Sequence, residues 1–580
     1  MIGQYRSSPI ALGRFTSTIG SMLVRRARQW PDHAVAATRS ADHEYIPVPW
    51  SRFLDDIASL AGFLHGQGIR RGDRVAVFSP NSYGMLVWEM AVTSMGAVSV
   101  PIFAGYDVKN VTYILEHAEP KAIYVDGAKR LEIFEECPGR AGIGIVVTRE
   151  PSRYACLADA LKGGPMEAFL KLVAQVKPDH TAFIQYTSGT TGNPKGVMLS
   201  HRNIMSQRRA LSKIWKVGRD SRFLSYLPWH HSFGGLFERF SALYHGATIY
   251  LEDSLGKDLD RLIQNWSLVK PTQFFSVPKI FIELVTESKL APEVKEILFH
   301  PELKFVFTAA APLPRECGEY FKAQNVQVME GWGLTETSPC VTLTPPAKER
   351  IHSFVGEPIP GCEILTAEDG EILVRGPNIM KGYFKDPERT RRVLDDLGWF
   401  HTGDLGEISD YGLRMICRVD GLFKLSNGEK VSSMLVENAI TISSRWIQHA
   451  IALGTGEEFV GALVFPNFRN LEHWAKEQGR TLPKGFELAQ DREIQGLIAA
   501  EIQQNMSDFQ PKYMEVQAFT IIPKELTLED GELTPTMKVI RHRVAAKYHE
   551  WIEALFHPNR HPNKLPYIVR LKGEDYVYTW

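Results

Sequence analysis

The chain has 580 residues, and its 66 Lys and Arg nearly balance its 67 Asp and Glu, giving a formal net charge of −1. This balance excludes the strong positive charge of proteins whose main partner is nucleic acid or an anionic membrane surface. The length allows more than one hydrophobic core, so we expect a large and a small domain.

The cysteines and the apolar segments indicate the compartment. The six cysteines are widely spaced and form no C-x-x-C pair, which predicts free thiols in a reducing environment. Arginines interrupt the N-terminal segment where a signal peptide would be apolar, and Gly, Ser, Thr and Pro interrupt the apolar run 90–106. We therefore expect a soluble, cytoplasmic protein without a transmembrane segment, for which peripheral membrane contact stays open.

The first part of the chain alternates between strand-like and helix-like segments. Residues 74–78 and 121–125 are short apolar runs typical of strands, whereas 82–95 and 108–117 are typical of helices. This rhythm predicts an α/β fold with mostly parallel sheets.

The segment 186–196 is the most informative part of the chain. It combines four Ser and Thr hydroxyls with three glycines and Lys195. Glycines let backbone N–H groups approach a ligand, and the hydroxyls and the lysine add donors and positive charge, as a triphosphate requires. The alternative is a surface turn rich in Ser, Thr and Gly.

The flanks of this segment distinguish it from the usual P-loop, in which a lysine follows the second glycine and a helix begins at once. Residues 181–186 and 196–199 are typical of strands, so the loop is expected to join two strands. Ser200 is a suitable N-cap for a helix over about 202–215.

Two adjacent histidines, His230 and His231, follow in the segment 225–234. Neighbouring positions point to different faces of the chain, so the pair does not have the spacing of metal ligands, and packing is the ordinary role of such residues.

Two later segments suggest nucleotide contacts. In Glu330–Ser338 a tryptophan lies between glycines and is followed by Glu336, so a flat ring could lie against a purine and a carboxylate could hold Mg²⁺. In Thr402–Asp404 a carboxylate could accept hydrogen bonds from both ribose hydroxyls. Taken alone, each segment would be interpreted as an ordinary turn.

Together these motifs resemble the adenylate-forming superfamily of acyl-CoA synthetases, luciferases and nonribosomal adenylation domains, over about residues 20–555. The resemblance implies a large N-terminal domain of mixed and parallel sheets flanked by helices, and a small, mobile α+β C-terminal domain. We place the first at 1–419, with the ATP and acyl sites, and the second at 420–557, with a hinge at Asp420. The tail 558–580 has no assignment.

The resemblance also implies roles for individual residues in the N-terminal part. His231 would lie near the acyl carboxylate or the incoming thiol, and Gly234 and Gly235 would leave room for an acyl chain. Thr335 would contact the α-phosphate, and Glu336 would bind Mg²⁺. Trp332 stands where the family usually has Tyr, and Ala309 where it usually has Gly. Other nucleotide-site or pocket residues on this basis are Thr187, Ser188, Gly189, Thr190, Thr191, Gly192, Lys195, Ala310, Ala311, Pro312, Glu330, Gly331, Trp332 and Gly333.

Near the C-terminal part, Asp404 and Arg418 would hold the ribose, and Gly428 would line the tunnel for pantetheine. Lys538, in the segment Thr534–Lys538, resembles the lysine that catalyses adenylation by bridging the carboxylate and the α-phosphate. ATP, Mg²⁺ and CoA are the implied cofactors and co-substrates.

The predicted function is an ATP-dependent long-chain acyl-CoA synthetase, by resemblance to bacterial enzymes in the segments 275–281, 462–468 and 538–556. The main alternative is an acyl-AMP ligase that loads an acyl carrier protein, because both acceptors present pantetheine. A regulatory protein that binds ATP without turnover is a third interpretation, which the intact Lys195, Glu336, Asp404 and Lys538 disfavour.

Overall fold

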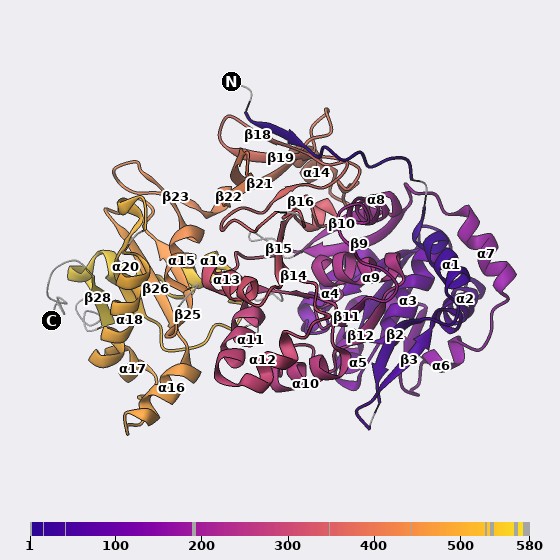
Figure 1. The fold of residues 1–580 in the computed structure, drawn as a ribbon, viewed down its shortest axis with the longest axis horizontal. Coiled ribbons are helices and arrows are strands. Elements are labelled where there is room, and N and C mark those ends of the chain that lie inside the picture. Colours follow the sequence, from indigo (N-terminus) through magenta and orange to yellow (C-terminus); the bar gives the residue numbers. More distant parts are fainter. Residues whose placement is uncertain are drawn as a thin grey trace. The chain divides into compact units, whose positions relative to one another are not determined.

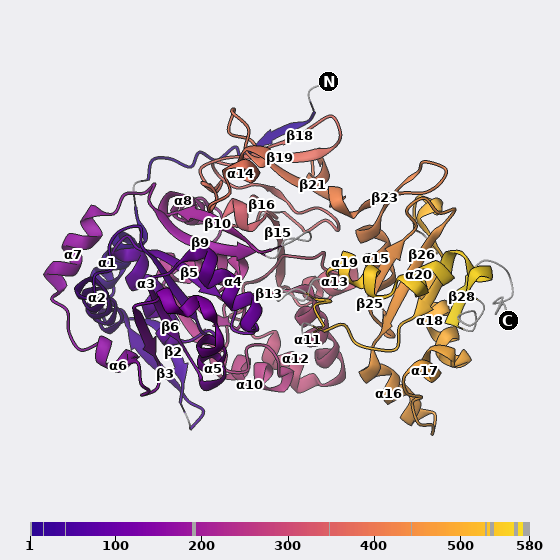
Figure 2. The same cartoon turned by 180° about the vertical axis from the view of Figure 1, so that it is seen from behind.

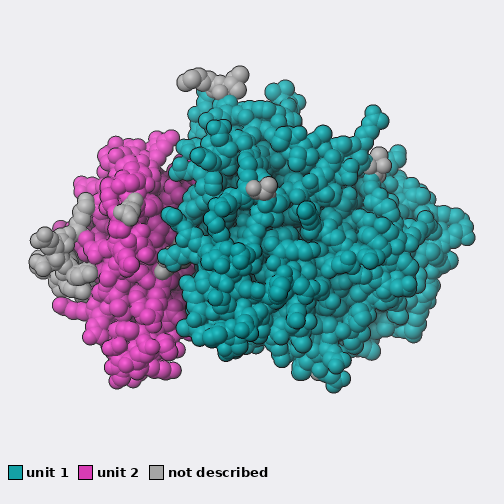
Figure 3. Space-filling view, viewed as in Figure 1, with its two compact units in different colours: residues 1–189, 193–402, 407–414 teal, residues 190–192, 403–406, 415–580 magenta. Residues whose placement is uncertain are grey.

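The computed structural model describes the chain except for residues 1–2, 16, 41, 188–192, 347, 442–443, 508, 528–529, 534–538, 562–566 and 572–580, and the side chain of Asp420. The described chain falls into two compact units, coloured separately in Figure 3. The first comprises residues 1–189, 193–402 and 407–414, and the second comprises 190–192, 403–406 and 415–580. The boundary runs through two strands, β21 (Phe400–Ser409) and β22 (Gly412–Arg418).

Helices are distributed along the whole chain (Figure 1). Their bounds are α1 Ile19–Gln29, α2 Trp50–Gly66, α3 Tyr83–Ser94, α4 Val108–Ala118, α5 Ala128–Glu136, α6 Leu157–Ala160, α7 Met166–Gln175, α8 His201–Leu211, α9 Arg239–His245, α10 Leu259–Val269, α11 Pro278–Leu290, α12 Pro292–Leu298, α13 Arg315–Ala323, α14 Pro387–Val393, α15 Ser433–Thr441, α16 Phe468–Glu477, α17 Phe486–Gln490, α18 Arg492–Asn505, α19 Arg541–Lys547 and α20 His549–Phe556.

One large sheet of the first unit is parallel over most of its width and antiparallel at one edge. Its strands, in spatial order, are β20 (Gly382–Tyr383), β10 (Lys195–Ser200), β9 (Thr181–Thr187), β5 (Val98–Ile102), β4 (Arg74–Phe78), β6 (Ala122–Val125), β7 (Ile145–Thr148) and β8 (Ala155–Cys156). The apolar face of α4 packs with this sheet around Val100 and Phe78. The strands and helices expected at 74–125 are therefore confirmed.

A second large sheet, visible from both sides in Figures 1 and 2, is parallel through its centre. Its strands, in spatial order, are β17 (Glu357–Pro358), β16 (Thr342–Leu343), β15 (Gln327–Trp332), β14 (Phe305–Thr308), β13 (Gln273–Ser276), β11 (Arg222–Ser225), β12 (Thr248–Leu251), β2 (Ala34–Arg39) and β3 (Tyr45–Pro49). A smaller sheet has the order β1 (Tyr5–Ser7), β18 (Glu363–Thr366), β19 (Glu371–Arg375), β21, β22.

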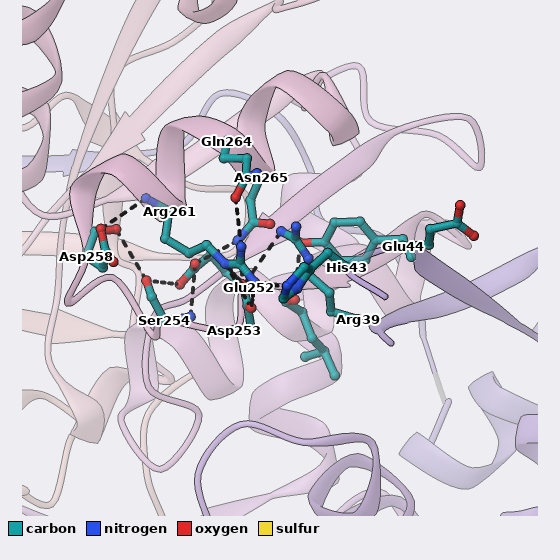
Figure 4. Close-up of polar contacts among 12 residues, drawn as sticks. Arg39, His43, Glu44, Glu252, Asp253, Ser254, Asp258, Arg261, Gln264 and Asn265 are labelled. Carbon is teal, nitrogen blue, oxygen red and sulfur yellow. Dashed lines mark hydrogen bonds and ion pairs between the residues drawn. The ribbon is translucent and has the colours of Figure 1, made fainter. Parts of the chain in front are cut away.

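A polar network ties the end of β12 to α10 (Figure 4). Asp258 caps α10 by accepting a hydrogen bond from the backbone N–H of Arg261, 3.0 Å away. The guanidinium of Arg261 bonds Asp253 at 2.8 Å and Nδ1 of His43 at 2.9 Å, so the β2–β3 hairpin is held to the same helix. Asn265 completes the network by donating to Glu252 at 2.9 Å.

The second unit has its own sheet and core. Its strands, in spatial order, are β25 (Ile447–Leu453), β26 (Val460–Pro466), β27 (Val516–Ile521) and β28 (Ile568–Arg570). Apolar side chains of α15 and α18 pack on this sheet in a continuous core. The tail, which had no assignment, supplies β28, antiparallel to β27.

The helix expected after Ser200 begins as predicted but ends early. Ser200 caps α8, and its side chain accepts from the backbone N–H of Asn203. The helix ends at Leu211, not at Trp215, so the predicted end is wrong. The chain turns there because Trp215 packs into an aromatic cluster with Phe237 and Phe305.

Two compositional expectations can be compared with the structure. All six cysteines are free. None of the helices in the described ranges has the length and apolar character needed to span a bilayer.

Candidate active site

Three side chains from distant parts of the first unit meet at the base of the hydroxyl-rich loop. The Lys195 ammonium lies 2.8 Å from Oε1 of Glu336. The Tyr383 hydroxyl accepts a hydrogen bond from Lys195 at 2.9 Å and donates one to the same Glu336 oxygen at 2.8 Å. We call this group the Lys–Tyr–Glu cluster.

The backbone holds the Lys–Tyr–Glu cluster in place. Lys195 begins β10, which pairs with β9 in antiparallel register so that Lys195 lies opposite Thr187. On the other side of β10, Tyr383 in β20 lies opposite Val197. The 3₁₀ turn Thr335–Thr337 is tied to the segment that leads into this edge strand, because the N–H of Met380, two residues before the strand, donates to the carbonyl of Glu336 at 2.8 Å.

The electrostatics of the cluster favour an ionised Glu336. Its side chain is only 6% exposed, and the burial by itself would raise the pKa, but the Lys195 ammonium and the hydrogen bonds hold the pKa below its usual value. A carboxylate that stays charged in a buried position is suited to a cation.

The residues present fit a magnesium ion that arrives with a nucleotide. Mg²⁺ is usually held by one or two carboxylates together with substrate phosphates. Glu336 offers one such carboxylate, and the neighbouring Thr335 offers a hydroxyl. That hydroxyl lies 3.1 Å from the hydroxyl of Ser232, which connects this turn to the histidine segment.

The two adjacent histidines have different environments, as the sequence predicted. His230 is half-buried beside Phe103, with ring centroids 4.4 Å apart, and desolvation of its ring lowers its pKa well below the usual value. His231 is half-buried, and its Nδ1 accepts a hydrogen bond from the N–H of Phe233 at 3.3 Å. Both histidines are half-buried, so exposure does not distinguish them, and the role of His231 stays a prediction.

The space that a side chain would take at Gly234 and Gly235 is filled by backbone, so the room expected at these glycines is not found. They lie in a π-helical turn, Phe233–Glu238. A Cβ on Gly235 would lie 1.9 Å from the carbonyl oxygen of Trp229, and one on Gly234 would lie 2.6 Å from that of Leu227. The glycines are required because the preceding backbone fills this space.

The segment Glu330–Gly333 ends β15 and leads into the turn that carries Glu336. The Glu330 carboxylate is buried and lies 2.6 Å from the Arg350 guanidinium, so its side chain is engaged in an internal ion pair. Trp332 is half-buried at the strand end. Gly333 is required by packing, since a Cβ there would lie 1.7 Å from the carbonyl oxygen of Pro339.

The small residues after β14 form an exposed loop. Ala310 and Ala311 are exposed, and Pro312 is half-buried. Ala310 has a φ of 76°, a left-handed conformation that costs roughly 1–2 kcal/mol for a residue with a Cβ. The family difference noted at Ala309 therefore lies one residue before the strained position.

In the second unit, the Asp404 carboxylate in β21 is buried and accepts a hydrogen bond from the Arg418 guanidinium at 2.9 Å. This pairing brings together the two residues predicted to hold the ribose. Gly428 lies in the turn between β23 (Leu422–Lys424) and β24 (Lys430–Ser432). Lys538 and the loop residues Ser188, Gly189, Thr190, Thr191 and Gly192 lie outside the described residues.

Sequence reasoning missed three residues of this region: Tyr383, Ser232 and Arg350. Each contacts a predicted residue elsewhere in the sequence: Tyr383 bonds Lys195 and Glu336, Ser232 bonds Thr335, and Arg350 pairs with Glu330. Arg350 follows no motif, and Tyr383 belongs to a two-residue strand. Only Ser232, directly after His231, lay inside a segment already selected.

Comparison with known proteins identifies the family of the chain. The family model described as AMP-binding enzyme matches residues 23–384, and the model described as AMP-binding enzyme C-terminal domain matches residues 420–560. The chain therefore belongs to the AMP-binding enzyme family, within the adenylate-forming superfamily, and the resemblance seen in its motifs is confirmed.

Particular relatives extend this comparison. A long-chain-fatty-acid–CoA ligase of Mycobacterium bovis is 26% identical over 95% of this chain and 98% of its own length. A chloroplastic long-chain-fatty-acid–[acyl-carrier-protein] ligase of Arabidopsis thaliana is 26% identical over 88% of this chain and 83% of its own length. The crystal structure of ATP-bound MatB from Rhodopseudomonas palustris matches with a TM-score of 0.73 and 23% identity, over 92% of this chain and 99% of that one. The predicted fold class is therefore confirmed.

Proposed function

We propose that this chain is an ATP- and Mg²⁺-dependent ligase that activates a long-chain fatty acid as its acyl-adenylate and then transfers the acyl group to CoA. The products are acyl-CoA, AMP and pyrophosphate. The observation that carries the proposal is the Lys–Tyr–Glu cluster, which places a buried carboxylate and an ammonium at the base of a hydroxyl- and glycine-rich loop. Membership in the AMP-binding enzyme family supports the nucleotide chemistry.

In the first step, the fatty-acid carboxylate attacks the α-phosphate of ATP, and pyrophosphate leaves. We assign Lys195 and residues 187–192 to the outgoing phosphates, Glu336 and Thr335 to the magnesium side, and Asp404 with Arg418 to the ribose. Bound Mg²⁺ would neutralise charge on the phosphate oxygens. Lys538 is assigned to the charge that develops between carboxylate and α-phosphate, where a preorganised cation is most effective.

The second step displaces AMP by a thiol. We assign Gly428 to the passage of the pantetheine arm and His231 to the neighbourhood of the reacting carbonyl. The domains proposed for these two steps are 1–419 and 420–557, with Asp420 as the hinge. The free thiols support a reducing, cytoplasmic location.

One relative supports an alternative acceptor. The similarity to a long-chain-fatty-acid–[acyl-carrier-protein] ligase means that a carrier protein could replace CoA in the second step. The first step would be unchanged, because both acceptors attack through the same pantetheine thiol.

The test is pyrophosphate release from ATP across a panel of acids, each with no acceptor, with CoA and with a phosphopantetheinylated carrier protein. Acids of about 12 to 18 carbons should outrun acetate and benzoate, and CoA should speed turnover. Preference for benzoate would overturn the substrate class. Turnover with the carrier protein but not with CoA would replace the main proposal by its alternative. Glu336→Gln should be inactive, and Lys381→Met, a neighbouring lysine directed to the carbonyl of Asp179, should be active.

A further inference from the structure

The Lys–Tyr–Glu cluster contains more contacts than a simple ion pair needs. Lys195 and Tyr383 both bond the same oxygen of Glu336, at 2.8 Å each. The lysine also bonds the tyrosine hydroxyl at 2.9 Å and lies 4.6 Å from the centre of the tyrosine ring. Tyr383 therefore holds the ammonium through its oxygen and through its ring at once.

This arrangement is incompatible with a metal ion on the same oxygen. A magnesium ion coordinates a carboxylate oxygen at about 2.1 Å. An ammonium 2.8 Å from that oxygen would then face a divalent cation across a short distance. The site is largely shielded from water, with Lys195 22% exposed and Glu336 6% exposed, so the repulsion would be only weakly screened.

Lys195 lies in the chain where a second anionic partner would arrive with a nucleotide. It is the first residue of β10, directly at the end of the hydroxyl-rich loop, with Thr187 opposite on β9. Phosphates bound by this loop would offer the ammonium a new anionic partner. The ammonium and the metal would then both be satisfied, each by a different anion.

We propose that Tyr383 is a positioning residue that holds Lys195 against Glu336. A divalent cation then binds this carboxylate tightly only together with a nucleotide, because the phosphates of the nucleotide bind the lysine in place of Glu336. The inference deepens the proposed function, because it takes Glu336 as the magnesium carboxylate and the loop as the phosphate site. It adds a reason for the metal and the nucleotide to bind cooperatively beyond their direct contact.

The test measures Mn²⁺ binding to the full-length chain in the absence of nucleotide, by the loss of the free-ion electron paramagnetic resonance signal. Lys195→Met should bind Mn²⁺ about tenfold or more tightly than the wild type, because Glu336 loses its competing cation. Tyr383→Phe should shift affinity in the same direction by a smaller factor. Lys381→Met is the matched control and should bind Mn²⁺ as the wild type does.

A second measurement identifies the site. Millimolar Mg²⁺ should raise the melting temperature of Lys195→Met, since a ligand that binds the folded state stabilises it. The double variant Lys195→Met/Glu336→Gln should lose both this rise and the tighter Mn²⁺ binding. Equal Mn²⁺ affinity in Lys195→Met and the wild type would overturn the proposal, as would tight binding that survives in the double variant.

The outcome is separable from that of the proposed function. If the wild type activates fatty acids but Lys195→Met binds Mn²⁺ no more tightly, only the proposed competition between Lys195 and the metal is refuted. A chain that shows the shift but activates no acid refutes the proposed function and leaves the competition between Lys195 and the metal in place.

Discussion

Arg239 on α9 and Glu89 on α3 form an ion pair in the interior of the first unit, where their side chains are 1% and 0% exposed. Ser99 on β5 donates to Glu89 at 3.1 Å, and the Arg239 guanidinium lies 5.0 Å from the centre of the Trp229 ring. Trp229 directly precedes His230 and His231, so the pair anchors the segment that carries them.

Removing one partner of this pair should be strongly destabilising. Glu89→Gln leaves the Arg239 charge buried without its counter-charge, and we expect a loss of about 3–5 kcal/mol in the free energy of unfolding. Urea denaturation of Glu89→Gln, Arg239→Met and the double variant would measure it, with the double variant losing less than the two single losses combined. Glu167→Gln, in the exposed pair with Lys171, is the control and should change stability by under about 0.5 kcal/mol. Equal effects at Glu89 and Glu167 would contradict the structural role.

His201 should make the protein sensitive to mild acid. Burial lowers its pKa to about 3, and its Nδ1 accepts a hydrogen bond from the N–H of Ile19 at 3.2 Å. Because the unfolded chain takes up the proton near pH 6.5 and the folded chain resists it, this contribution to stability is present above pH 6.5 and is lost as the pH falls toward 3. The loss is about 1.4 kcal/mol per pH unit.

The measurement compares urea unfolding at pH 7.5 and pH 5.5 in the wild type and in His201→Asn, whose amide oxygen can still accept from Ile19. The wild type should lose about 1 kcal/mol more than the variant over this interval. Other buried histidines, such as His245, titrate in both proteins and cancel in the comparison. Identical losses would show that folding does not lower the pKa of His201.

Asp404 should discriminate the sugar of the nucleotide if it holds the ribose. Asp404→Asn keeps the size of the side chain but removes the charge, so the KM for ATP should rise about 10- to 100-fold, the range for losing a charged hydrogen-bond acceptor. The preference for ATP over 2′-deoxy-ATP should shrink at the same time. Arg418→Gln should have a smaller effect, because the Arg418 side chain is 46% exposed. An unchanged sugar preference in Asp404→Asn would remove it from the ribose site.

Lys538→Ala should strongly reduce adenylation while leaving the fold intact. We expect acid-dependent exchange of pyrophosphate into ATP to fall by about 10²–10³-fold, the typical effect of removing one preorganised charge donor. Lys484→Ala, an exposed lysine of the same unit, is the control. Full exchange in Lys538→Ala would contradict the catalytic role of Lys538. This prediction depends on the sequence motif alone, since Lys538 lies outside the described residues.

Local patterns in the sequence predicted local structure well. The residue types at 181–186 and 196–199 predicted a strand–loop–strand unit, and Ser200 marked a helix start, because pairing and capping depend on neighbouring residues. The end of α8 was predicted wrongly because it is decided by the packing of Trp215 against Phe237, which is distant in sequence. The room expected at Gly234 and Gly235 was wrong for the same kind of reason, since only the folded chain shows that the backbone of Trp229 fills it.

The sequence by itself determined the family, the residue types of the nucleotide site and the loop that should meet the phosphates, because these depend on short motifs of fixed spacing. Only the tertiary structure decided that Lys195 is held by Glu336 and Tyr383, and that Glu330 is engaged with Arg350. Such contacts depend on the order of strands in the sheet and on the path of the chain between them. No local pattern encodes them, although they set the charge at the site.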